Sequence, residues 1–147
     1  MVNSRKRLVW LLILVFLASV GFIQKNTIAQ TDVDTQDIRS VIEAQLRAIA
    51  VDNWPLAFSF AGSGIKRQLN SPESFKKMVL EGYRIVYRPR ILSFKGKIII
   101  GGMPRYLFYM VGSDGRAAVV VYSMSNQGNE GWRISGVKLF SAKGRVV

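Results

Sequence analysis

Apolar residues recur at helical spacing between residues 37 and 51. The residues of this stripe are Ile38, Val41, Ile42, Leu46 and Ile49. Because positions three and four apart share one face of an α-helix, the spacing predicts an amphipathic helix with one buried side. Asp34 or Thr35 is available as its N-cap.

Two shorter helices are predicted to follow. One begins with Trp54-Pro55 and is expected to end at the run Gly62-Ser63-Gly64. The other begins at Ser71-Pro72, because serine is a favourable N-cap and proline suits the first helical position. It is expected to end at Gly82, since glycine is common where helices stop.

Beyond Gly82 the hydrophobic period changes to two, which indicates antiparallel strands joined by turns. The expected strands are 87–95, 106–111, 116–124 and 132–140, and residues 98–100 either extend the first or start another. Pro89 confines the start of the first strand to an edge or a bulge. The turn Gly112-Ser113-Asp114-Gly115 is a strong hairpin signal.

The last predicted strand changes phase along its length. Trp132 and Ile134 share one face, whereas Val137 and Leu139 lie in the opposite phase. A bulge at Gly136 would direct all four side chains toward the core. The predicted fold is therefore α+β, with N-terminal helices packed on a curved antiparallel β-meander that closes into a cone-like roll.

The first 29 residues have the pattern of an export signal. Arg5, Lys6 and Arg7 precede the uncharged apolar run 8–23, and Thr27-Ile28-Ala29 carries small residues where signal peptidase requires them. We expect cleavage after Ala29 and export across the cytoplasmic membrane to the periplasm or the exterior. The alternative is an uncleaved membrane anchor through residues 8–23, although that run spans only about 24 Å of the roughly 30 Å hydrocarbon core.

Export would leave a single domain. Residues 30–36 are polar and are expected to form a flexible lead-in, and residues 37–147 form one α+β domain with no internal linker. Removal of residues 1–29 takes away four of the 21 basic residues and leaves 17 against nine acidic ones, a net charge of +8. We expect this basic surface to be solvated or to meet an anionic envelope surface, and we expect no nucleic-acid partner.

The chain contains no cysteine and no histidine. The missing cysteine excludes disulfides, thiolate nucleophiles and iron–sulfur clusters, and the missing histidine excludes Ser-His-Asp catalysis and most transition-metal sites. We therefore expect no cofactor and no metal. The nine acidic residues fall in the lead-in, at helix ends, on polar faces or in turns, so none is placed as a buried general base.

Several short motifs occur together in the chain. The most specific is Gly82-Tyr83 followed by Tyr87-Arg88-Pro89. The others are 57–61, 71–75 and 132–137. In this combination the sequence resembles an uncharacterised bacterial family, domain of unknown function 4864, over residues 38–140.

That resemblance implies an exported or envelope-associated protein and a fold similar to the nuclear transport factor 2-like superfold. It implies no activity and no catalytic residue, because this superfold carries many unrelated functions. Arg84 departs from the apolar residue or proline expected after the Gly-Tyr pair, which adds charge beside the motif.

Gln45 is the most unusual residue of the first predicted helix. It falls in the centre of the apolar face, where an unsatisfied amide would cost about 1–3 kcal/mol. Its side chain either projects into a pocket between this helix and the sheet, or bonds a backbone group at a bulge near Gly136.

The segment Tyr87-Arg88-Pro89-Arg90 brings two guanidinium groups together. If strand alternation holds, Arg88 and Arg90 lie on one face and could clamp a carboxylate or phosphate. Alternatively, they are exposed or pair with acids, for which the candidates are Glu73, Glu81 and Asp114. A set of aromatic residues either lines a pocket or forms core: Tyr83, Tyr106, Phe108, Tyr109, Tyr122 and Trp132.

These observations predict an exported, non-catalytic domain that binds a small anionic or amphipathic ligand, or a protein partner, between the first helix and the sheet. The expected ligand-binding residues are Gln45, Tyr87, Arg88, Arg90 and Trp132. Two alternatives stay open. One is a tyrosine-dependent enzyme similar to isomerases or dehydratases, and the other is an envelope-associated structural protein that uses its basic surface.

Overall fold

The computed structural model describes residues 34–142. Residues 34–50 are helical, and we call them the first helix. The helices that follow are α2 (Trp54–Ser59), α3 (Ser63–Leu69), α4 (Pro72–Gly82) and the 3-10 turn η1 (Arg84–Val86). The strands are β1 (Ile91–Ile100), β2 (Met103–Val111), β3 (Ala117–Asn126) and β4 (Trp132–Ser141), with η2 (Gly128–Glu130) before β4.

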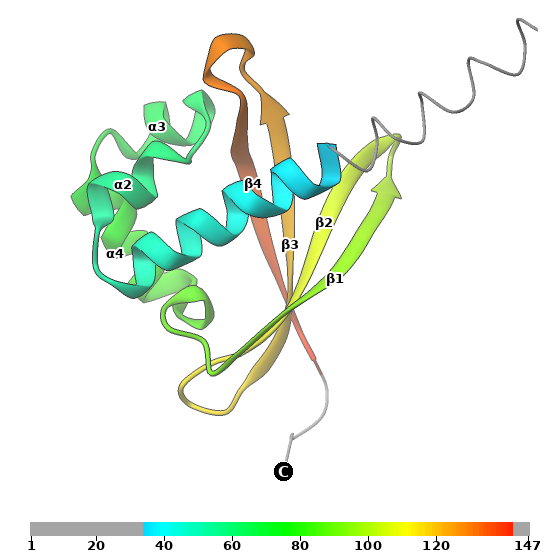
Figure 1. Ribbon diagram of the computed structural model, residues 1–147. Helices are drawn as coiled ribbons and strands as arrows, with labels where there is room; N and C mark the ends of the chain where they lie inside the picture. The colour runs from blue at the N-terminus through cyan, green and yellow to red at the C-terminus, as the bar shows by residue number, and fades with distance from the viewer. Residues whose placement is uncertain (1–33, 143–147) are drawn as a thin grey trace, which may run out of the picture. The chain divides into compact units, whose positions relative to one another are not determined.

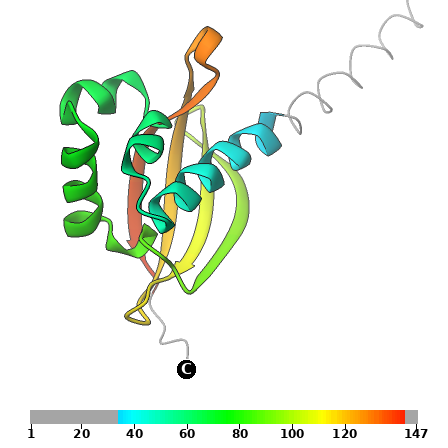
Figure 2. The same cartoon turned by 60° about the vertical axis from the view of Figure 1, so that its left-hand side comes forward.

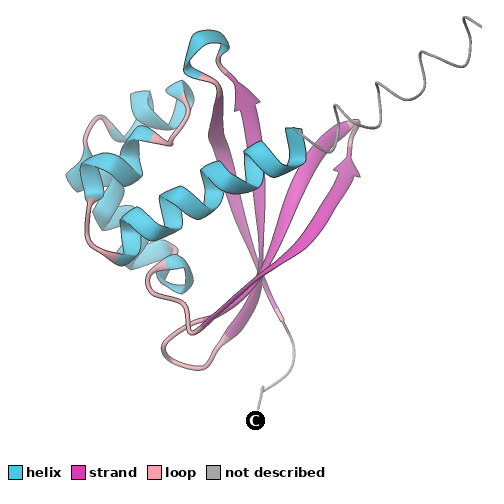
Figure 3. Ribbon diagram, in the orientation of Figure 1, coloured by secondary structure: helices cyan, strands magenta, loops and turns pink. Residues whose placement is uncertain are grey.

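The four strands form one antiparallel sheet in the order β1-β2-β3-β4. The first helix, α2, α3 and α4 lie on the same face of this sheet, and the first helix runs diagonally across it (Figures 1 and 2). The first helix, α2, α3 and α4 precede all the strands along the chain, and only the short turn η2 lies between two strands. Figure 3 distinguishes helices from strands by colour. The predicted α+β class and meander are confirmed, but the sheet is open at both edges rather than closed into a cone.

The core lies between the first helix and the sheet. Ile38, Ile42 and Ile49 of the helix are almost fully buried, as are Phe108 of β2 and Tyr122 of β3. The predicted apolar stripe therefore does face the sheet. The helix already includes residues 34 and 35, so neither Asp34 nor Thr35 is its N-cap, and the helix extends into the stretch predicted as lead-in.

The start and end of α4 follow the sequence signals. The Ser71 hydroxyl accepts a hydrogen bond from the Ser74 backbone N–H at 3.1 Å, which is the N-cap interaction expected of serine. Pro72 occupies the first helical position, and Gly82 is the last residue of the helix. Both predicted boundaries are confirmed.

Helix α3 is absent from the sequence prediction. The run Gly62-Ser63-Gly64 was expected to end a helix, but Gly62 is the N-cap of α3 and Ser63 and Gly64 form its first turn. Glycine is tolerated at the N-cap because that residue has extended rather than helical backbone. Asn70, in the left-handed conformation, ends α3.

The first strand begins later than predicted. Residues 87–90 are not in a strand, and Arg88 has a φ of 54°, in the left-handed region. Strand β1 starts at Ile91 and continues through residues 98–100. The prediction that Arg88 and Arg90 share a strand face is therefore wrong, because alternation requires extended backbone at both positions.

A bulge produces the change of phase in the last strand, and it lies one residue before the predicted position. Ser123 pairs with Gly136 and Met124 pairs with Ile134, so Ser135 is the extra residue on β4. Ile134 and Val137 both face the core as expected, whereas Leu139 is 37% exposed and is not part of it. A second register shift lies between Phe94 and Gly96 on β1.

Among residues 34–142, no helix has both the length and the apolar character needed to cross a lipid bilayer. The predicted export signal 1–29, its cleavage site at Ala29 and the possible anchor 8–23 lie outside the described residues.

Candidate functional site

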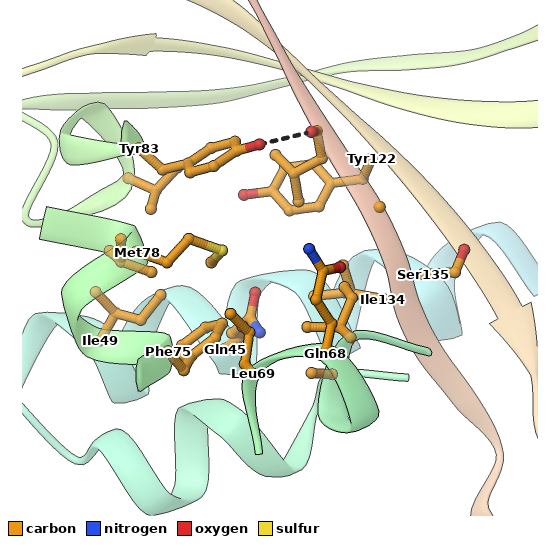
Figure 4. Close-up of a pocket in the computed structure, with 16 residues that line it drawn as sticks. Gln45, Ile49, Gln68, Leu69, Phe75, Met78, Tyr83, Tyr122, Ile134 and Ser135 are labelled. Carbon is orange, nitrogen blue, oxygen red and sulfur yellow. Dashed lines mark hydrogen bonds between the residues drawn. The ribbon is translucent and has the colours of Figure 1, made fainter. Parts of the chain in front are cut away.

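A pocket of about 260 Å³ lies where the first helix, α3 and α4 meet the bulge of β4. Its floor and walls are mainly apolar side chains, and Figure 4 shows Phe75 and Met78 of α4 and Leu69 of α3 around it. Ile134, Gly136 and Val137 of β4 close the side next to the sheet. The pocket was predicted between the first helix and the sheet, and it lies there with α3 and α4 as further walls.

The bulge fixes the wall next to the sheet. Two backbone hydrogen bonds tie β4 to the segment before α3: Gly62 N–H donates to Ile134 C=O at 2.8 Å, and Ile134 N–H donates to Phe60 C=O at 3.0 Å. Because Ser135 is an extra residue, Ile134 and Val137 both point inward on either side of it. The shape of the pocket therefore depends on a local irregularity of the last strand.

Gln45 enters the pocket from the first helix and is only 5% exposed. Its amide nitrogen donates to the Ala57 carbonyl at 3.0 Å, and its amide oxygen points toward the pocket (Figure 4). Both interpretations of this residue are therefore partly right: it lines a pocket, and it bonds a backbone group. That group belongs to α2 rather than to the bulge near Gly136.

Two tyrosine side chains face each other across the upper part of the pocket (Figure 4). The Tyr83 hydroxyl donates to the Val137 carbonyl at 3.4 Å, a long hydrogen bond. Tyr122 is fully buried, and burial raises the pKa of its hydroxyl well above the usual value because the charged phenolate would be desolvated. These hydroxyls and the Gln45 amide give the pocket polar groups that carry no charge.

The pocket is lined by no Lys, Arg, Asp or Glu among the described residues. Gln68 of α3 and Ser135 at the bulge add two more neutral polar side chains at its edge. Gln68 and Met78 were not singled out from the sequence, because α3 was not predicted and methionine at helical spacing is ordinary core. Their proximity depends on how α3 packs against β4.

The predicted arginines lie elsewhere. The Arg88 guanidinium binds the Asp52 carboxylate at 2.6 Å and the Ala50 carbonyl at 2.9 Å. Tyr87 donates its hydroxyl to the same carboxylate at 3.1 Å, and the Arg88 guanidinium lies 4.8 Å from the centre of its ring. Arg90 is exposed. Arg88 therefore forms an ion pair, as the alternative interpretation predicted. Its partner is Asp52, however, and not Glu73, Glu81 or Asp114.

The remaining predicted residues also lie outside the pocket. Tyr87 stacks on Trp54 with ring centres 6.1 Å apart, and Trp132 packs half-buried against the core. Of the aromatic set, only Tyr83 and Tyr122 line the pocket, while Tyr106 and Phe108 are buried in the core. The structure thus brings Gln45 together with two tyrosines and separates it from the other four predicted ligand-binding residues.

A second hollow of about 430 Å³ lies beside the β2–β3 turn. Arg84, Arg116 and Asp114 lie on it, and Arg116 already pairs with Asp114 at 2.7 Å. Its larger volume is mostly open to solvent, since these side chains are exposed. We regard the smaller pocket as the better candidate because its lining is largely buried. Among residues 34–142, no three His, Cys, Asp or Glu side chains gather closely enough to hold a metal ion.

A family model for a domain of unknown function, DUF4864, matches residues 31–147. The chain belongs to this DUF4864 family. The resemblance to this family is thereby confirmed. In the structure the Gly-Tyr and Tyr-Arg-Pro motifs form the end of α4 and the left-handed turn before β1. No curated protein and no solved structure matches the chain, so the likeness to the nuclear transport factor 2-like superfold is not confirmed.

Proposed function

We propose that this DUF4864 domain is a non-catalytic binding module that holds a small amphipathic ligand with an uncharged polar head. The ligand would lie in the pocket between the first helix, α3, α4 and β4. Its apolar part would contact Phe75, Met78 and Leu69, and its head would meet the Gln45 amide oxygen and the Tyr122 hydroxyl.

The observation that carries this proposal is the composition of the lining. Apolar walls with a few convergent polar groups are typical of small-molecule sites. A dry cavity of roughly 150 Å³ holds benzene, so about 260 Å³ suits a ligand of roughly ten non-hydrogen atoms. Such a ligand would gain free energy mainly from burial of its apolar part.

An anionic ligand is less favoured than an uncharged one. A buried carboxylate or phosphate requires a paired charge, because an unpaired ion loses its hydration without compensation. The described lining offers no cation, and Arg88 is engaged with Asp52 outside the pocket. Of the two ligand classes predicted from the sequence, the amphipathic one therefore fits these groups better.

A tyrosine-based enzyme is also less favoured. A general base needs a pKa near the working pH, and burial shifts the pKa of Tyr122 in the opposite direction. The Tyr122 hydroxyl is therefore better suited to donate a hydrogen bond to a ligand than to remove a proton from one.

Octanol and octanoate test the proposal, because they share an alkyl chain and differ in head-group charge. We expect isothermal titration calorimetry to detect octanol binding and to find octanoate at least about tenfold weaker, which is the cost of burying an unpaired charge. Equal affinities, or tighter binding of octanoate, would contradict a pocket that selects an uncharged head.

Met78→Trp is expected to fill the pocket and abolish octanol binding. Met103→Trp is the matched control, because Met103 is 55% exposed on a distant hairpin and the same side chain is introduced. Circular dichroism checks that the Met78→Trp variant folds. If the folded variant still binds octanol, the binding site lies elsewhere.

A further inference from the structure

The hairpin that joins β1 to β2 ends in exposed apolar side chains. Ile98, Ile99, Ile100 and Met103 are 42%, 64%, 52% and 55% exposed. Between them, Gly101 and Gly102 both have positive φ, 58° and 75°, which forms the tight two-residue turn that suits the twist of a hairpin. The tip is thus a regular strand pair rather than an irregular loop. Its apolar side chains are exposed to solvent.

The apolar side chains at the tip point to both sides of the hairpin. Ile98 pairs with Arg105 and Ile99 pairs with Pro104, and successive side chains on a strand alternate between faces. Ile98 and Ile100 therefore lie on one face and Ile99 lies on the other. All three are exposed, so neither face of the tip is covered within the described chain.

The charges along this hairpin are all positive. Residues 91–111 contain Lys95, Lys97 and Arg105 and no acidic residue. Lys95 and Lys97 are exposed, and the Lys95 ammonium lies 5.7 Å from the centre of the Tyr109 ring. Arg105 lies directly opposite Ile98, and Lys97 and Lys95 lie one and three residues back along β1, toward the body of the sheet.

We propose that the β1–β2 tip inserts into the interface of an anionic lipid membrane. A strand rises about 3.3 Å per residue, so immersion of residues 98–103 to the level of Ile98 reaches roughly 7–10 Å, the depth at which interfacial segments lie. At that depth Arg105 and Lys97 are level with the phosphate groups, and Lys95 lies further out on the aqueous side. Each basic residue near an anionic surface strengthens binding.

A lipid surface fits this tip better than a protein partner does. A protein surface would cover one face of the hairpin and leave the isoleucine of the other face in water, whereas lipid surrounds both faces. Antiparallel pairing of β1 with a second copy, centred on Gly96, would place Lys95 opposite Lys97 of that copy, and like charges directly opposite are unfavourable. This inference is independent of the ligand proposed for the pocket.

A single fluorescent label tests the proposal in the full chain. Because the sequence has no cysteine, Ile99→Cys supplies one attachment point for an environment-sensitive dye. We expect a blue shift of its emission in vesicles of phosphatidylglycerol and phosphatidylcholine, and a smaller shift in phosphatidylcholine alone. Raised ionic strength should reduce the difference between the two, because salt screens the lysine and arginine charges.

Ser113→Cys is the matched control. Ser113 is exposed in the turn at the other end of β2, so a dye there should stay in water in the same vesicles. This control removes any effect of the apolar run 8–23, since that run is present in both labelled chains. Adding Ile98→Ser and Ile100→Ser to the Ile99→Cys chain should abolish the shift.

Two results would overturn the proposal. One is a dye at position 99 that stays water-exposed on anionic vesicles to which the chain is bound. The other is a blue shift that appears without lipid as protein concentration rises, which would assign the tip to an interface between protein molecules.

Discussion

Gln45 donates its side-chain amide hydrogen to the carbonyl oxygen of Ala57 at 3.0 Å, across twelve residues of sequence. Helix α2 has only six residues, and its last carbonyls have no partner within the helix. Ser59 satisfies one of them by donating its hydroxyl to Leu56 at 2.7 Å, and Gln45 satisfies another. The buried amide therefore joins the first helix to α2 while its oxygen remains available to the pocket.

Replacing Gln45 by leucine should destabilise the protein. The change keeps an apolar side chain of similar size but leaves the Ala57 carbonyl without its donor in a buried place, at a cost of about 1–3 kcal/mol. Urea denaturation measures this as a lower free energy of unfolding. An unchanged free energy would mean that the bond contributes nothing to stability.

Replacing Gly62 by alanine should also destabilise the fold. A Cβ atom at this position would lie 3.1 Å from the Gln127 amide nitrogen and 3.2 Å from the Ile134 carbonyl oxygen. Such crowding costs about 1–3 kcal/mol, because the backbone of β4 would have to move. Thermal unfolding should show a lower melting temperature.

Gly136→Ala is the control for that change. A Cβ atom there would meet only the Ser123 side chain at 3.7 Å, which is ordinary contact. If both alanine variants lose the same stability, the close approach of Gly62 to β4 is not the reason for the effect.

Arg88→Gly should be more stable than Arg88→Ala by about 1 kcal/mol. Both changes remove the ion pair with Asp52, which joins half-exposed side chains and contributes about 1 kcal/mol or less. They differ because Arg88 has a φ of 54°, which glycine adopts freely and alanine does not. Denaturation curves of the two variants give the difference directly, and equal curves would contradict it. Octanol affinity should be the same in both, since Arg88 lies outside the pocket.

The stability of the protein should fall as the pH rises past 10. Burial raises the pKa of Tyr122 above its unfolded value of 10.0, so its neutral hydroxyl stabilises the folded state fully below that pH. Above pH 10, Tyr122 ionises first in the unfolded chain. This ionisation lowers the free energy of the unfolded state relative to the folded state. Tyr122→Phe should reduce this alkaline loss, as measured by urea denaturation at neutral and alkaline pH. A variant with the same pH dependence as the natural chain would contradict the assignment.

The fold was largely predictable because its signals are local. The stripe from Ile38 to Ile49, the Ser71-Pro72 start of α4 and the Gly112–Gly115 turn each depend on a few neighbouring residues. The error at Gly62-Ser63-Gly64 has a different cause. Glycine there permits close approach to β4, which lies some seventy residues later in the chain, and a local pattern carries no information about that contact.

The site was predicted only in part, for the same reason. Gln45 was detectable as a polar residue on an apolar face, and that anomaly located the pocket. Arg88 could not be placed by strand alternation, because alternation requires extended backbone. Its left-handed φ and its partner Asp52 depend on tertiary contacts. Gln68 was undetectable, since a glutamine on an exposed helix face is common and only the packing of α3 brings it to the pocket.

The bulge at Ser135 is required by the spacing of the residues beside it. Ile134 and Val137 are three residues apart, so a strand without a bulge would direct one of them into solvent. Removal of Ser135 would leave them two residues apart and both facing inward, but β4 would lose the bend that a bulge gives a strand. A change of length at this position would therefore act on the cavity through the path of the backbone rather than through exposure of core side chains.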